Sequence, residues 1–219
     1  MPLSKRLAAA LAFAASAVSL LTQPAAADPV PFDSNWREQG FSLFSSNRYE
    51  LNGSQVNIQS DGTVSLIWRN VFPTFVNARN ATWRWSVQTS VPGTDLTIKG
   101  GDDRNASIYF VFTDDEIDPN RPPSARKLLG DPDTRALVYI WGGSHPVGSV
   151  LQSPYAPGLR NIILKAPGTG DFIESVDLAA DYQRAFGAAP GQLVGLAISA
   201  DSDDTDTSIR ASIGGLVLN

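Results

Sequence analysis

Apolar side chains recur at every second position along most of this chain, and that spacing constrains the fold more than any other feature of the sequence. In residues 81–87 the large residues Trp83 and Trp85 alternate with polar ones, so one face of this segment should be buried and the other solvated. Residues 106–113 are apolar on both alternating faces, which predicts a central strand covered on both sides. The chain is therefore expected to consist mainly of β-strands.

Other segments complete the expected architecture. Further strands are predicted at residues 64–71, 137–141, 161–165, 193–200 and 209–218, separated by segments rich in proline and glycine. The Gly214-Gly215 pair allows a bulge or bend in the last of them. One helix is predicted over residues 177–186, with Asp177 as its N-cap and Gly187 as its left-handed stop.

Many short strands with few helices leave two solutions, a sandwich of two sheets or one closed sheet. We expect the sandwich: residues 28–219 should form a single all-β domain, a jelly-roll-like antiparallel β-sandwich with one short helix. Residues 114–132 are polar and contain prolines, which is typical of a long surface loop. A lid over one edge of a sheet and a plain solvated loop are both compatible with this segment.

Residues 1–27 have the features of a secretory signal peptide. Lys5 and Arg6 precede a run rich in Ala and Leu, and a cluster of small residues ends at Ala27. The apolar run is shorter than the roughly 20 residues that a membrane-spanning helix needs, and no later stretch approaches that length. We therefore expect a periplasmic or secreted protein with no membrane span.

Charge and cysteine content argue against several classes of partner and site. Removing Lys5 and Arg6 from the 17 basic residues leaves 15 against 22 acidic residues, so residues 28–219 carry a formal charge of −7. Nucleic acids and anionic membranes attract clustered Lys and Arg, so neither is expected as a partner. The sequence has no Cys, so no disulfide framework can form and stability must come from a packed core.

Two acidic turns are the strongest candidates for a binding site. Asp102 and Asp103 end a glycine turn directly before the predicted central strand. Asp201 and Asp203 belong to a run of four carboxylates that follows another apolar strand. Neighbouring carboxylates repel one another, so burying them requires a cation, a Lys or Arg side chain, or a proton.

Calcium suits such turns because it prefers oxygen ligands. The match to an EF-hand loop fails, since Asp206 occupies the glycine position and Ser212 the position of the bidentate Glu. A sandwich-type calcium site at Asp201 and Asp203 stays open, although no cofactor is required. The alternative is that the acids accept backbone hydrogen bonds in their turns, as Asp commonly does.

Aromatic residues offer another route to binding, because an exposed Trp ring stacks on sugar rings. Trp83 and Trp85 favour the core, whereas the position of Trp141 stays open; it opens a glycine-rich segment that holds His145, the only histidine. With no Cys, no G-x-S-x-G motif and one His beside Pro146, nucleophilic catalysis and zinc binding are poorly supported. Glycoside hydrolysis stays an alternative, since it needs only two suitably spaced acids.

Several motifs occur in order along the chain: 82–85 (TWRW), 99–103 (KGGDD), 139–141 (YIW), 181–182 (DY) with 186–187 (FG), and 201–205 (DSDDT). In these the chain resembles a bacterial family, the domain of unknown function 3047. The resemblance implies an exported β-rich domain whose biochemical role is not established, and it supplies no catalytic residue. In that family the last motif is more like Asp-Thr-Asp-Asn-Thr, so Ser202 and Asp204 are departures here.

The leading hypothesis is a module that binds a ligand, first of all a glycan, without transforming it. A hydrolase acting on envelope polysaccharide or ester and a structural envelope protein are the alternatives. Lys99 and Arg160 are the expected basic partners of the acids. The candidate ligand-binding residues are Lys99, Asp102, Asp103, Tyr139, Trp141, Arg160, Asp201 and Asp203. The hypothesis requires the two acidic turns to meet at one end of the sandwich.

Overall fold

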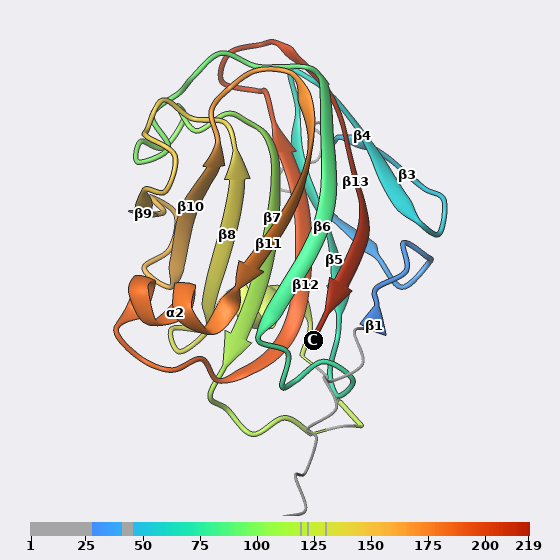
Figure 1. Ribbon diagram of the computed structural model, residues 1–219, viewed down its shortest axis with the longest axis vertical. Helices are drawn as coiled ribbons and strands as arrows, with labels where there is room; N and C mark the ends of the chain where they lie inside the picture. The colour runs from blue at the N-terminus through green and yellow to red at the C-terminus, as the bar shows by residue number, and fades with distance from the viewer. Residues whose placement is uncertain (1–27, 41–45, 119, 122, 130) are drawn as a thin grey trace, which may run out of the picture.

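The computed structural model describes residues 28–40, 46–118, 120–121, 123–129 and 131–219. The predicted signal peptide, residues 1–27, lies outside the described residues. Two β-sheets pack face to face and enclose the main hydrophobic core (Figure 1). The fold is a jelly-roll-like β-sandwich, which confirms the predicted fold class.

The two sheets contain six and seven strands. In the smaller sheet the order is β11 (Gly170–Asp177), β6 (Asn80–Thr89), β13 (Ser208–Leu218), β4 (Gln55–Asp61) and β3 (Arg48–Leu51), with β1 (Asp28–Pro29) also paired to β13. In the larger sheet the order is β2 (Arg37–Gly40), β5 (Val64–Asn70), β12 (Gln192–Asp201), β7 (Arg104–Thr113), β8 (Arg135–Trp141), β10 (Leu159–Lys165) and β9 (Val150–Gln152).

The sheets are antiparallel except for one pair. Strands β8 and β10 run parallel, and the other described strand pairs are antiparallel, as predicted. Two parallel strands need a long connection that returns the chain to the end of the sheet at which the first strand began. Residues 142–158 form this connection. Strand β9 lies within this connection and pairs antiparallel with β10.

The strands predicted from apolar periodicity are confirmed, each to within a few residues, as β5, β6, β7, β8, β10, β12 and β13. Strand β7 lies between β12 and β8, as its apolar residues on both faces predict. The register of β13 against β6 shifts after Gly214, where the glycine pair predicts a bulge. The sequence does not predict β11, which is largely exposed, or β4, whose buried apolar residues are only Val56 and Ile58.

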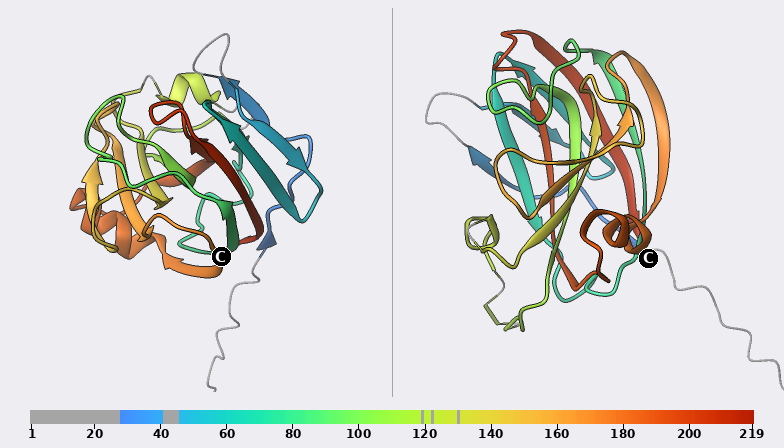
Figure 2. Two further views of the ribbon diagram at one scale, coloured as in Figure 1. Left: turned by 90° about the horizontal axis from the view of Figure 1, so that it is seen from above. Right: turned by 90° about the vertical axis from the view of Figure 1, so that its left-hand side faces the viewer.

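The predicted helix is α2 (Leu178–Phe186). Asp177 caps it by accepting a hydrogen bond from the backbone N–H of Ala180 at 2.9 Å, and Gly187 ends it with φ 73°. A second, single-turn helix, α1 (Ala125–Leu129), lies in the segment predicted as a long loop. It sits on the side of the larger sheet that faces away from the smaller one (Figure 2). Neither helix in the described part of the chain has the length and apolarity to cross a bilayer.

Aromatic rings fill the space between the sheets. The ring of Trp83 lies 5.5 Å from the rings of both Trp85 and Tyr139, and Trp85 lies 5.5 Å from Trp141. All four side chains are at most 1% exposed. Trp83 and Trp85 therefore belong to the core, as expected, and the stability of the sandwich depends on their burial.

Candidate functional site

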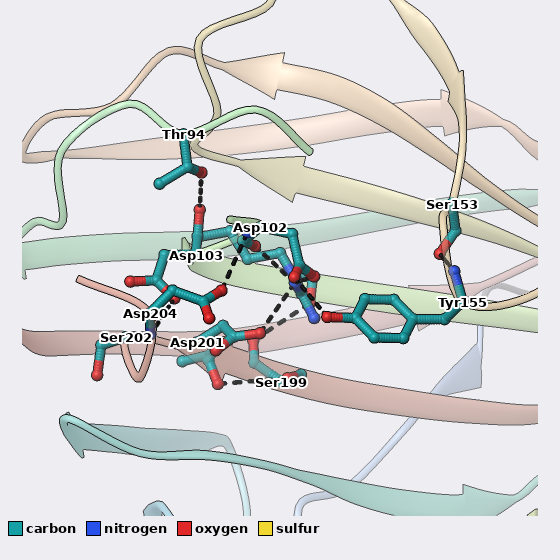
Figure 3. A network of polar contacts seen from close by, with 12 residues as sticks. Thr94, Asp102, Asp103, Ser153, Tyr155, Ser199, Asp201, Ser202 and Asp204 are labelled. Carbon is teal, nitrogen blue, oxygen red and sulfur yellow. Dashed lines mark hydrogen bonds and ion pairs between the residues drawn. The ribbon is translucent and has the colours of Figure 1, made fainter. Parts of the chain in front are cut away.

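Two acidic turns meet at one end of the larger sheet (Figure 3). The first turn precedes β7 and ends in Asp102 and Asp103; the second follows β12 and begins at Asp201. Because β7 and β12 are antiparallel neighbours, the start of one lies beside the end of the other, and Arg104 is in register with Asp201. Strand pairing thus brings together the two turns that the sequence indicates as a site.

Arg104 is the cation that joins the two turns. Its Nη1 donates hydrogen bonds to Oδ2 of Asp102 at 2.9 Å and to Oδ2 of Asp201 at 3.1 Å, and its Nη2 donates to the Tyr109 hydroxyl at 3.2 Å. The side chains of Arg104, Asp102 and Asp201 are 10%, 6% and 7% exposed. Burial alone would lower the pKa of Arg104, but Tyr109, Asp201 and Asp102 outweigh it, so the pKa is raised and the guanidinium stays charged.

Asp103 fixes the second turn against the first. Its Oδ1 accepts a hydrogen bond from the backbone N–H of Asp204 at 3.2 Å, and its Oδ2 accepts from the backbone N–H of Thr205 at 2.8 Å and from the Thr205 hydroxyl. In return, Oδ2 of Asp204 accepts from the backbone N–H of Asp102 at 3.2 Å. For Asp103 and Asp204, the structure therefore matches the alternative in which turn acids accept backbone hydrogen bonds.

Asp201 is only half satisfied. Its Oδ2 is bound by Arg104, but its Oδ1 is buried and, among the described residues, has no hydrogen-bond partner. Burial raises the pKa of Asp201 to about 8; the charge of Arg104 lowers it, and neighbouring Asp203 and Asp102 raise it again. One carboxylate oxygen each of Asp103, Asp201 and Asp203 lies within 4.8 Å of the other two. The chemistry of such a group suits either a proton or a cation.

The acids open onto a groove on the outer face of the larger sheet. We call it the outer-face groove; it consists of two adjoining pockets of about 480 and 310 Å³ that share Leu66, Tyr109, Tyr155, Ala156 and Leu159. Ile67, Ile108 and Ile198 of the same strands point into the core between the sheets, so the groove residues lie on the opposite face. The polar or charged residues of the larger pocket are Asp102, Arg104, Tyr109, Ser153, Tyr155, Asn161, Asp201, Asp203 and Asp204.

Three aromatic residues line the outer-face groove. The indole ring of Trp68 lies directly over Gly195 of the neighbouring strand, where a Cβ atom would be 1.7 Å from the nearest ring carbon. Tyr155 is 56% exposed and donates its hydroxyl proton to Oδ1 of Asp102 at 2.6 Å, as Figure 3 shows. Tyr109 is held by Arg104. The groove therefore combines flat apolar surfaces with an acidic end.

Three predicted site residues lie elsewhere. Tyr139 and Trp141 point into the core, where they are at most 1% exposed, and the Tyr139 hydroxyl donates to Oδ2 of Asp181 at 2.7 Å. Arg160 lies on the face of β10 opposite to Asn161, with its guanidinium 5.0 Å from the ring centre of Phe186. None of the three reaches the acidic turns. The reason is strand alternation, which turns alternate residues of one strand to opposite faces.

Lys99 stays near the site but does not pair with the acids in the way expected. Its Nζ lies 5.6 Å from the ring centre of Tyr155, which itself binds Asp102. The compensating charge comes instead from Arg104. The sequence holds a signal for it, since Arg104 follows the acid pair directly.

The matching family model is described as "Protein of unknown function (DUF3047)" and covers residues 34–217. The chain belongs to the DUF3047 family. This confirms the resemblance in the sequence motifs, and the site described above lies wholly within the matched part of this DUF3047 chain. No curated protein matches the sequence significantly.

Several solved structures are remotely similar to this DUF3047 chain. The xyloglucanase domain of NopAA from Sinorhizobium fredii, in complex with cellobiose, shares 7% identity at a TM-score of 0.48, covering 84% of this chain and 92% of that one. Endoglucanase 3 of Trichoderma harzianum, from family GH12, shares 11% identity at a TM-score of 0.40, covering 90% and 100%. The adhesin domain K3 of Lys-gingipain from Porphyromonas gingivalis shares 9% at 0.38, covering 86% and 94%. At such values, function has to be argued from the chain's own residues.

Proposed function

We propose that this protein is a non-catalytic module that binds a carbohydrate in the outer-face groove. The observation that carries the proposal is the Trp68 ring, which packs against Gly195 and lines the groove. A ring supported in this way offers a rigid apolar plane at little cost in conformational entropy. The C–H faces of a sugar ring stack on such a plane.

The rest of the groove supplies the polar contacts that a sugar needs. Sugar hydroxyls both donate and accept hydrogen bonds, and Asp203, Asp204 and the Asn161 amide line the larger pocket. A pocket of about 480 Å³ is within the size range of small-ligand sites. Because the acids give this end a negative charge, we expect neutral or amino sugars to bind in preference to uronic acids.

The state of the acids favours binding over hydrolysis. A glycosidase places two carboxyl groups on either side of the scissile bond, open to the substrate. Of the three acids whose oxygens lie within 4.8 Å, Asp103 is fully buried and held by Thr205, and Asp201 is 5% exposed and held by Arg104. Of these three, only Asp203 is exposed to solvent. Asp204, the other exposed acid of the larger pocket, has its Oδ2 bonded to the backbone N–H of Asp102.

The test is a glycan array with the full chain, followed by calorimetry with the best oligosaccharide and with variant Trp68→Ala. We expect the variant to lose about tenfold or more in affinity, equivalent to about 1.4 kcal/mol. Phe172→Ala is the matched control, because Phe172 is 41% exposed but lies on β11 of the smaller sheet. Absence of any glycan binding, or equal losses in both variants, contradicts the proposal. Cleavage of the bound oligosaccharide, seen by mass spectrometry, would instead favour a hydrolase.

We further propose that the protein acts in the periplasm or after secretion. The support is the signal-peptide pattern of residues 1–27 together with a sequence that contains no Cys. The measurement is the mass of the protein recovered from the periplasm or medium. A mass that corresponds to a chain beginning at Asp28 is expected, and a full-length cytoplasmic product contradicts it.

A further inference from the structure

The acidic end of the groove carries more negative charge than its side chains neutralise. Five carboxylates gather there, from Asp102, Asp103, Asp201, Asp203 and Asp204, and in the described part of the chain the one guanidinium that pairs with them is that of Arg104. With all groups ionised, the cluster has a formal charge of −4. Backbone N–H groups offset part of this charge, but a bound cation would reduce it most directly.

A second observation points to a ligand at this place. Asp201 is 5% exposed, its Oδ2 is taken by Arg104, and its Oδ1 is buried with no hydrogen-bond partner among the described residues. Buried polar atoms are almost always satisfied by protein, water or an ion. Since one oxygen each of Asp103 and Asp203 lies within 4.8 Å of an Asp201 oxygen, the Asp201 carboxylate belongs to a group of three possible ligands.

We propose that Asp103, Asp201 and Asp203 bind a calcium ion. Calcium accepts oxygen ligands in flexible geometry and completes its coordination with water, whereas zinc prefers nitrogen and sulfur, and magnesium requires a near-ideal octahedron. Asp103 accepts three hydrogen bonds, which leaves it one of about four acceptor positions for a metal and orients it through its neighbours.

The surroundings of the proposed ion are consistent with exchange from solvent. Asp203 is exposed, so it gives an ion a path of entry, while Asp103 and Asp201 are held in place by the hydrogen bonds described above. Asp201 and Asp203 also line the larger pocket of the outer-face groove. A calcium ion held there would present its remaining coordination positions to the groove. This site does not depend on whether a carbohydrate binds.

The experiment treats the full chain with chelator, removes the chelator, and titrates calcium chloride at constant ionic strength without sugar. We expect a rise in the melting temperature and one bound ion per chain by calorimetry. Magnesium chloride should give a much smaller shift. No calcium-dependent shift at millimolar concentration, or an equal response to magnesium, overturns the proposal.

Two variants in the turn after β12 test which residues bind the ion. Asp203→Asn changes an exposed ligand and should leave the fold intact while weakening calcium binding at least tenfold. Asp206→Asn is the matched control: Asp206 is also exposed in this turn but lies outside the group of three, and its φ of 50° suits Asn. Full calcium binding by Asp203→Asn, or equal losses in both variants, contradicts the assigned ligands.

Discussion

The outer faces of the two sheets each hold an Arg–Asp ion pair, but the two pairs differ in their exposure to water. On the smaller sheet, residues 80–87 of β6 alternate between exposed or half-buried and buried positions, and Arg84 binds Asp171 at 2.7 and 2.8 Å with the two side chains 63% and 45% exposed. On the larger sheet, β7 is buried on both faces, and its arginine, Arg104, pairs with two acids beneath a groove. Both faces hold an Arg–Asp pair at a strand, but only one pair is out of water.

The difference shows what a strand that is apolar on both faces implies. One face of β7 contributes to the core between the sheets, and its other face is covered by α1, Tyr155 and the segments beside them. This cover is incomplete, so it leaves the groove. A face that is apolar but only partly covered is where a ligand gains most from leaving water, whereas the polar face of β6 offers it little.

The largest expected effect separates the two arginines. Arg104→Ala leaves the buried Asp102 carboxylate without its cation and the buried Asp201 without its hydrogen-bond donor, so we expect it to lower the free energy of unfolding by about 3–5 kcal/mol. Arg84→Ala removes a solvent-exposed pair and should change stability very little. The measurement is urea unfolding at pH 7 for both variants.

The control for this comparison is the response to salt. Adding salt should weaken the contribution of Arg84 further and leave that of Arg104 largely unchanged, because buried pairs are poorly screened. Equal losses in the two variants would mean that the two faces do not differ electrostatically. If Arg104→Ala does not fold, Arg104→Lys keeps the charge, loses part of the hydrogen-bond geometry and should give a smaller loss.

The sequence predicts the outer face of the smaller sheet better than that of the larger sheet. The alternation around Trp83 predicts β6 and its solvated face, and the caps Asp177 and Gly187 predict α2, because both signals are local. The meeting of the two acidic turns needs the pairing of β7 with β12, whose joined residues are 97 apart in the chain. Periodicity reports that a strand has two faces, but it does not say which of them faces the partner sheet.

For the same reason, periodicity does not show which tryptophans lie in the core and which line the groove. Trp141 and Trp68 both end or lie within apolar strands, yet Trp141 is in the core and Trp68 is in the groove. Register against neighbouring strands decides between them, and register is a non-local property. The contact of Tyr155 with Asp102 is equally difficult to predict, because Tyr155 reaches Asp102 from a loop 53 residues away. Proline-rich loops give no periodic signal from which such a contact could be predicted.

A smaller effect tests the acidic end of the groove through pH. In metal-free protein the folded-state pKa of Asp201 is about 8 against an ordinary value of 3.8, so the folded chain holds a proton that the unfolded chain releases between these values. Stability should therefore fall, by a few kcal/mol in total, as pH rises from about 4 to about 8. Urea unfolding in chelator over this range measures the effect.

The matched variant for this pH profile is Asp201→Asn. Asn keeps an acceptor for Arg104 and cannot ionise, so the variant should lose that part of the pH dependence and be more stable than the wild type near pH 8. Groups that titrate elsewhere are common to both proteins and cancel in the difference between their curves. A difference that stays constant from pH 4 to pH 8 would show that Asp201 does not carry the proton.

A smaller loss of stability than that linked to Asp201 is expected for Gly195→Ala, which tests why the outer face has room for a ring. The new Cβ would lie 1.7 Å from a ring carbon of Trp68, so the indole has to swing away from β12. Because Trp68 is partly exposed, we expect the ring to move at a cost of about 1 kcal/mol, at the low end for overpacking.

Carbohydrate affinity of Gly195→Ala should nevertheless fall about as far as in Trp68→Ala, since both changes remove the same apolar ring surface from the groove. In a double-mutant cycle, Gly195→Ala should therefore have little further effect on affinity once Trp68 is Ala. Additive losses of affinity would mean that Gly195 contacts the ligand directly and that the Trp68 ring does not bind it. That result would remove the functional difference between the two outer faces.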